Sequence, residues 1–284
     1  MFSFVKMEGI GNDYVYVDAR KAAPKGLSKL ARAISDRHFG VGSDGLILIR
    51  TSRIKGVKHR MQMFNSDGSE SEMCGNGLRC VAKYLYDRNL ERKEEFSIET
   101  GAGVLHVKVT PTKGKHVAAK VQVNMGEPRL LRSQIPMAGE PEGMVVGLPL
   151  HVGGHEFAIT CVSMGNPHCV IFLPEPPSKE LVHGIGPLIE NHEWFPRRTN
   201  VEFVYRESER VLHQRTWERG AGETLACGTG ASAVCVAANL NGLAGRKVKI
   251  KLLGGDLEMH WNEKDTCVYK TGPAREVFSG VWPA

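Results

Sequence analysis

Alternation of apolar and polar residues is the commonest pattern along this chain, and it predicts many short strands. It runs through residues 2–18, 58–64, 96–109, 117–125, 156–163, 200–205, 210–217 and 247–261. A side chain that changes face at every residue is typical of a strand with one buried face. Gly-rich turns at 101–103 and 254–255 divide two of these runs, so we expect tight hairpins there.

Helical spacing of apolar residues is confined to a few segments. Residues 27–34 predict a surface amphipathic helix, and residues 181–191 predict a short one. Residues 78–88 carry a third helical pattern, and residues 226–240 are so apolar that their helix is expected to be buried on every side. Because strands are numerous and helices do not alternate with them, the pattern favours an α+β fold, in which curled sheets wrap central helices.

Two cysteine-containing stretches form an internal repeat. Residues 64–80 read FNSDGSESEMCGNGLRC, and residues 217–235 read WERGAGETLACGTGASAVC. Without gaps, Glu70 aligns with Glu223 and Cys74 with Cys227, at the constant offset 227 − 74 = 153. A chain of 284 residues is long enough for two domains of about 150 residues. The sequence therefore predicts two similar halves, each with one cysteine before a Gly-rich helix start.

Cysteine at a helix N-terminus has a chemical meaning. The first backbone N–H groups of a helix lack intrahelical partners, and they and the helix dipole are expected to lower the pKa of a nearby thiol. The same N–H groups bind carboxylates, and glycine allows close approach. Two such ends, at Cys74 and Cys227, would hold one carboxylate and place a sulfur on each face of its Cα. One thiolate as base and one thiol as acid could then invert that carbon.

Other polar residues recur around these cysteines. Asn12 and Asn166 each follow an early strand, 154 residues apart (166 − 12). Glu218 stands nine residues before Cys227, and Asn65 stands nine residues before Cys74. This shared spacing favours a role in substrate binding for both positions and for the neighbouring Arg219. His168 lies close to Asn166 and is a candidate to tune the base. The remaining cysteines are expected to pack in the interior; they are Cys80, Cys161, Cys169, Cys235 and Cys267.

Charge and composition narrow the function classes. The formal net charge is +6, without long basic runs, which disfavours binding to nucleic acid or to a membrane surface. Seven cysteines without a CxxC pair predict neither a disulfide framework nor a zinc site, and they favour a reducing, intracellular compartment. No signal peptide and no apolar run of about 20 residues is visible.

Five motifs together resemble the diaminopimelate epimerase family: MEGIGNDY, FNSDGSESEMCGNGLRC, SMGNPHCV, RRTN and ERGAGETLACGTGASA. The resemblance implies a cytoplasmic, cofactor-independent and metal-independent isomerase that interconverts LL- and meso-2,6-diaminopimelate, for lysine and peptidoglycan precursors. It implies a homodimer whose chains have two pseudo-symmetric domains, 1–120 plus 272–284 and 121–271. The active site is then expected in the cleft between the domains.

The resemblance also implies roles for single residues. Cys74 and Cys227 would be the base and the acid, supported by His168 and Glu218. The substrate-binding residues would be Asn12, Asn65, Gly75, Asn76, Asn166, Asn200, Glu218, Arg219, Gly228 and Thr229. One departure is Gly45, where many members have Gln, so that contact is either missing or supplied by Ser43 or the backbone.

Two other functions use the same thiols. A proline or hydroxyproline racemase-like enzyme would share the two-thiol chemistry, but its substrate has no second amino-acid head for Asn65, Asn200 and Arg219 to bind. A thiol-redox sensor would pair the cysteines as a disulfide and would not need these polar residues.

Overall fold

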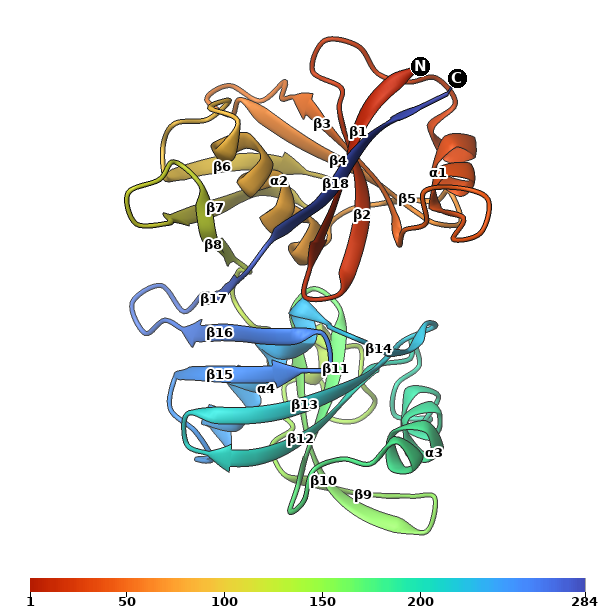
Figure 1. Ribbon diagram of the computed structural model, residues 1–284. Helices are drawn as coiled ribbons and strands as arrows, with labels where there is room; N and C mark the ends of the chain where they lie inside the picture. The colour runs from red at the N-terminus through yellow and green to blue at the C-terminus, as the bar shows by residue number, and fades with distance from the viewer. Residues whose placement is uncertain (284) are drawn as a thin grey trace. The chain divides into compact units, whose positions relative to one another are not determined.

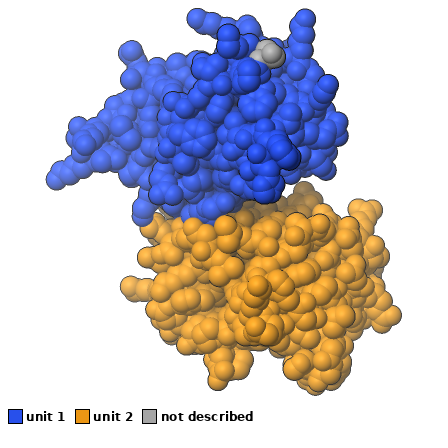
Figure 2. All heavy atoms as spheres, turned by 45° about the vertical axis from the view of Figure 1, so that its right-hand side comes forward, with its two compact units in different colours: residues 1–124, 271–284 blue, residues 125–270 orange. Residues whose placement is uncertain are grey.

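The chain forms two compact units in a computed structural model that describes residues 1–283. The first unit comprises residues 1–124 and the segment from residue 271 onward, and the second comprises residues 125–270. Figure 2 colours the two units separately. Within the described residues, no helix has the length and apolar character needed to cross a membrane.

The first unit is a curled sheet around one helix (Figure 1). Its strands are β1 (Phe2–Gly9), β2 (Asn12–Asp18), β3 (Gly45–Thr51), β4 (His59–Asn65), β5 (Glu70–Ser71), β6 (Glu95–Thr100), β7 (Gly103–Pro111), β8 (Ala118–Asn124) and β18 (Arg275–Trp282). Neighbouring strands are antiparallel except for the parallel pairs β2–β3 and β4–β6. Helix α2 (Gly75–Asp87) contacts β1, β2, β7 and β8, whereas α1 (Leu27–Ser35) packs on β2, β3 and β4.

The second unit repeats this design. Its strands are β9 (Leu148–Val152), β10 (His155–Ser163), β11 (Pro167–Leu173), β12 (Asn200–Ser208), β13 (Val211–Glu218), β14 (Gly222–Thr224), β15 (Lys247–Leu252) and β16 (Gly255–Trp261). Here β11–β12 and β13–β15 are the parallel pairs. Helix α4 (Gly228–Leu240) contacts β10, β11, β12, β15 and β16, and α3 (Lys179–Glu190) packs on β12 and β13. The short helix η1 (Arg132–Gln134) and strand β17 (Val268–Gly272) complete the elements.

The predicted fold class is confirmed: each unit is a mostly antiparallel sheet curled around a central helix. The predicted hairpin at 254–255 joins β15 to β16, where Leu252 pairs with Gly255. Helix α3 begins at Lys179, two residues before the predicted start, because Ser178 caps it by accepting a hydrogen bond from the N–H of Leu181 at 3.1 Å.

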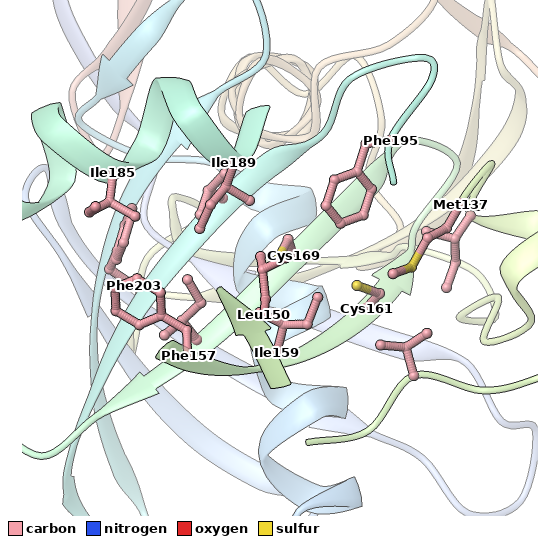
Figure 3. Packing of buried hydrophobic residues seen from close by; sticks show 14 of the residues in the cluster. Met137, Leu150, Phe157, Ile159, Cys161, Cys169, Ile185, Ile189, Phe195 and Phe203 are labelled. Carbon is pink, nitrogen blue, oxygen red and sulfur yellow. The ribbon is translucent and has the colours of Figure 1, made fainter. Parts of the chain in front are cut away.

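Four of the five cysteines that were expected to pack in the interior are buried. Cys161 and Cys169 are cross-strand partners in β10 and β11, and Figure 3 shows them beside Leu150 and Phe195 in the core of the second unit. Cys80 and Cys235 lie on α2 and α4 and are fully buried as well. The fifth, Cys267, is only half-buried, directly before β17.

Candidate active site

Both repeated cysteines are the N-cap residues of their central helices. Cys74 has extended backbone angles, φ −132° and ψ 115°, and its sulfur accepts a hydrogen bond from the N–H of Gly77 at 3.4 Å. Cys227 has nearly the same angles, φ −114° and ψ 113°, and accepts from the N–H of Gly230 at 3.3 Å. The sulfur therefore takes the place that a Ser or Asp oxygen usually has at a helix start. The predicted position of each thiol at a helix N-terminus is confirmed.

In the first unit, a chain of hydrogen bonds connects Cys74 to a carboxylate. The Cys74 thiol donates to Oδ1 of Asn12 at 3.1 Å, and Nδ2 of Asn12 donates to Oδ2 of Asp44 at 2.7 Å. Asp44 also accepts from the N–H of Asp13 and from the Arg37 guanidinium, at 3.0 and 2.9 Å. Because an ionised carboxylate only accepts, the amide nitrogen of Asn12 must face Asp44 and its oxygen must face the thiol.

A buried cation lies one turn into α2. Arg79 is completely buried, and its Nη1 donates to Oδ1 of Asn76 at 2.9 Å while Nε donates to the carbonyl of Pro273 at 3.0 Å. Its Nη2 is buried without a hydrogen-bond partner among the described residues. Burial lowers the pKa of Arg79, and Cys74 is among the groups whose charge opposes that shift. The cation therefore adds to the positive potential of the helix N-terminus and fixes the side chain of Asn76.

Asn65 and Gly45 lie opposite each other in β4 and β3. Nδ2 of Asn65 donates to Oγ of Ser69 at 3.0 Å. A side chain at Gly45 would collide with the carbonyl of Phe64, so the tight approach of the two strands excludes Gln here. Ser43 does not replace it, because its hydroxyl is buried and bonded to Ser35 and to the carbonyl of Gly45.

In the second unit, a longer chain connects Cys227 to a carboxylate. Sγ of Cys227 lies 3.4 Å from Oγ1 of Thr229, and Nδ2 of Asn166 donates to that hydroxyl at 3.3 Å. Oδ1 of Asn166 is 3.1 Å from Nε2 of His168. On the other side of the ring, Nδ1 of His168 is 2.8 Å from Oε1 of Glu202, and both side chains are completely buried. A histidine thus stands between the asparagine and the carboxylate, unlike in the first unit.

The expectation of a lowered thiol pKa is wrong for Cys227. Burial raises the pKa of the Cys227 thiol well above its ordinary value, and the negative charges of Glu218 and Glu202 raise it further. Hydrogen bonds from Thr229 and from the N–H of Gly230 act in the opposite direction. Desolvation dominates because the sulfur is surrounded by protein, so the helix N-terminus alone does not produce a thiolate there.

The other predicted residues of this unit lie around the ends of β12 and β13. Nδ2 of Asn200 donates to the carbonyl of Pro167 at 2.7 Å, and its Oδ1 accepts from the N–H of Arg219 at 3.0 Å. Asn200 therefore joins the turn that carries Asn166 to the residue pair 218–219. Oε1 of Glu218 accepts from the Thr224 hydroxyl at 2.5 Å.

Gly228 begins α4 next to a second buried cation. A side chain at Gly228 would collide with Nζ of Lys270, which is completely buried on β17. Glycine thus leaves the bare N–H groups accessible while a cation lies beside them, an arrangement suited to an anion. Each helix N-terminus accordingly has one buried cation, Arg79 or Lys270.

Three residues with metal-binding side chains lie close together. One ligand-type atom each of His168, Glu202 and Cys227 falls within 4.8 Å of the other two. His168 and Glu202 bind each other through Nδ1 and Oε1, and Glu202 accepts two further hydrogen bonds, from Gln214 and Thr216. We therefore interpret this group as a hydrogen-bond network of the thiol.

The sequence analysis missed four charged residues of these networks: Asp44, Arg79, Glu202 and Lys270. Two of them could have been recognised from the sequence, because they are charged residues within apolar segments. Glu202 interrupts the apolar run of residues 201–204, and Arg79 falls within the apolar helix that follows Cys74. A charged residue within a fully buried segment must have partners, so it is a candidate for a functional network.

Comparison with known proteins identifies one family. The model of the family described as diaminopimelate epimerase matches residues 4–131 and 160–277. A diaminopimelate epimerase of Leptospira biflexa is 52% identical over 98% of this chain and 98% of its own, and one of Methanococcus maripaludis is 50% identical with the same coverage.

Solved structures share the fold at low identity. A probable proline racemase from Agrobacterium radiobacter K84 has a TM-score of 0.71 at 14% identity, covering all of this chain and 93% of the other. A PhzF-family phenazine biosynthesis protein of Bacillus anthracis has a TM-score of 0.68 at 17% identity, covering 98% of each chain.

Proposed function

This chain belongs to the diaminopimelate epimerase family, and we propose that it interconverts LL- and meso-2,6-diaminopimelate by a two-base mechanism. It is an isomerase, as its relatives are. The observation that carries the mechanism is the repeated N-cap position of Cys74 and Cys227. Two sulfurs at equivalent helix starts supply the two bases that inversion of a carbon requires.

In this mechanism one substrate molecule reacts with both thiols. Its reacting carboxylate is bound by the free N–H groups at both helix starts, with Gly75, Asn76, Gly228 and Thr229 around it. One thiolate removes the Cα proton from one face, and the other thiol returns a proton to the opposite face. The roles of Cys74 and Cys227 exchange when the reaction runs in the other direction.

The remaining polar residues select the substrate. Amino and carboxylate groups, including those of the distal head, are bound by Asn12, Asn65, Asn166, Asn200, Glu218 and Arg219. His168 and Glu218 support the thiols. The carbanion is stabilised by N–H groups, and by the buried cations Arg79 and Lys270, in a site from which water is excluded. No cofactor is required, and the product serves lysine and peptidoglycan precursor synthesis in the cytoplasm.

The reaction is tested by isotope exchange. Incubation of LL-diaminopimelate with the reduced enzyme in D₂O is expected to give the meso isomer with one deuterium at the inverted Cα, without added metal or cofactor. L-Proline is the matched substrate, because a racemase of the other type would exchange its Cα proton instead. Exchange into proline but not into diaminopimelate would refute the proposal, and the absence of any exchange would do so as well.

We also propose a homodimer. Strand β18 supports this because Val277, Phe278 and Val281 expose 53%, 46% and 61% of their surfaces, and an apolar strip of this kind is suited to association. Sedimentation equilibrium is expected to give twice the chain mass, and Val281→Asp is expected to shift the protein toward monomer. A wild-type monomer at micromolar concentration would contradict the proposal.

A further inference from the structure

Glu202 is the buried anchor of the hydrogen-bond chain that ends at Cys227. It lies on β12 with a side chain of 0% exposure. Its Oε2 accepts from Nε2 of Gln214 at 2.7 Å and from Oγ1 of Thr216 at 2.6 Å, and Oε1 binds His168. Two side-chain donors and the ring of His168 therefore hold the carboxylate in place.

The carboxylate is also held in place by close packing. A side chain at Gly230, in the first turn of α4, would collide with Oε1 of Glu202. The glycine therefore lets the carboxylate approach the helix start, where the N–H of Gly230 also binds the sulfur of Cys227. The position of the anchor is thus coupled to the same turn of helix that holds the thiol.

The chain between Glu202 and Cys227 has two self-consistent directions. In the first, both ring nitrogens of His168 donate, so Asn166 turns its oxygen to the ring and its nitrogen to Thr229, whose hydroxyl then donates to the sulfur. In the second, Nε2 accepts, the amide of Asn166 is reversed, and the hydroxyl of Thr229 points away from the sulfur. The structure orients Asn166 as in the first arrangement, with Nδ2 bonded to Oγ1 of Thr229 and Oδ1 beside the ring.

We propose that Glu202 is the positioning residue for His168: it keeps both ring nitrogens protonated and thereby directs the hydroxyl of Thr229 to donate to the sulfur of Cys227. This chain of hydrogen bonds gives the buried sulfur of Cys227 a donor in addition to the N–H of Gly230. Burial disfavours the thiolate of Cys227, and a donated hydroxyl hydrogen bond compensates for part of this whenever the sulfur is charged during turnover. The inference rests on the catalytic role proposed for Cys227.

The charge state of His168 is tested directly in the full-length wild-type enzyme. With ¹⁵N-labelled histidine, both ring nitrogens of His168 are expected to show the imidazolium signature at pH 7.5, and Glu202→Gln is expected to convert the ring to a neutral form. His168→Gln assigns the signals. A neutral ring in the wild type overturns the inference, whether or not any variant folds.

The kinetic test uses a matched control in the same unit. Glu202→Gln is expected to lower kcat at least about tenfold with little change in KM, because the chain acts on a thiol and not on substrate affinity. Glu223→Gln breaks another carboxylate–histidine pair, Glu223–His183 at 2.8 Å, and is expected to retain wild-type kcat. Equal kcat in Glu202→Gln and wild type would overturn the inference.

Failure of the inference and failure of the proposed function are distinguishable. Full activity of Cys227→Ala refutes the two-base mechanism. An inactive Cys227→Ala together with a neutral wild-type His168 ring refutes only the role of Glu202.

Discussion

The two helix N-termini have the same backbone but different polar surroundings. In the first unit, Asp44 contacts Asn12 directly, so the amide oxygen faces Cys74 and accepts the proton of its thiol. In the second unit, His168 stands between the carboxylate of Glu202 and the amide of Asn166. The amide nitrogen of Asn166 therefore points toward Thr229, the residue next to the Cys227 sulfur. One inserted histidine reverses the direction of the hydrogen bonds.

In the proposed two-base mechanism, this difference would distinguish the two thiols. A two-base inversion needs one protonated and one ionised sulfur, and two identical surroundings would not distinguish them. In the first unit the sulfur of Cys74 donates to Asn12, whereas in the second unit the hydroxyl of Thr229 lies next to the sulfur of Cys227. The repeat therefore gives both sulfurs the same position at a helix start, and the side chains around each one differ.

The largest expected effect is the loss of either sulfur. Cys74→Ala and Cys227→Ala are each expected to lower kcat/KM at least about 10³-fold, because either variant lacks one of the two proton carriers. Circular dichroism should show that the fold survives. The matched control is Cys267→Ala, whose half-buried side chain lies outside both networks and whose activity should stay normal. A fully active Cys74→Ala would rule out the two-base scheme.

The next effect concerns the direct carboxylate–asparagine contact. Asp44→Ala removes the acceptor that orients Asn12, so the amide can rotate and the hydrogen bond to Cys74 is lost. We expect kcat/KM to fall by about tenfold to 100-fold. Asp18→Ala, which removes only a partly exposed ion pair with Arg20 in the same unit, should leave the rate unchanged. Equal rates for the two variants would show that Asn12 needs no anchor.

A pair of glycines compares the packing of the two helix starts. A Cβ at Gly230 would collide with the carboxylate of Glu202, which Gln214, Thr216 and His168 hold in place. A Cβ at Gly77 would instead lie 2.6 Å from Cδ1 at the end of the Ile47 side chain, which can give way by rotation. We expect Gly230→Ala to cost about 3 kcal/mol of unfolding free energy and Gly77→Ala about 1 kcal/mol. Urea denaturation measures both, and the reverse order would contradict the packing difference.

The smallest effect concerns a second cysteine on each central helix. Burial raises the pKa of the Cys80 thiol to about 12, and that of Cys235 also to about 12, from an ordinary 9.0. The folded state therefore keeps a proton that the unfolded state loses above pH 9, so stability is complete below pH 9 and falls between pH 9 and 12. We expect each thiol to lower the free energy of unfolding by about 1.4 kcal/mol at pH 10.

This alkaline loss is measured by urea denaturation at pH 8 and pH 10. Cys80→Ala and Cys235→Ala should each reduce the difference between the two pH values by the same amount. Unequal reductions would show that the two helices are not equally buried, and no reduction in either variant would contradict the role of these thiols.

The sequence by itself determined the design of each half. Alternation of apolar residues predicted the strands, the apolar segments after Cys74 and Cys227 predicted the central helices, and the 153-residue offset predicted the repeat. These features could be predicted because strand and helix periods are local, and because a helix start is defined by a few neighbouring residues. The family followed from five motifs that are contiguous in the chain.

Tertiary structure alone decided the electrostatics of the site. Asp44 contacts Asn12 from 32 residues away, and Glu202 contacts His168 from 34 residues away, through strands that pair side by side. No local pattern contains these partners. Burial reversed the expected pKa shift of Cys227 because desolvation depends on everything that packs around the sulfur, while a helix dipole is a local property of its own segment.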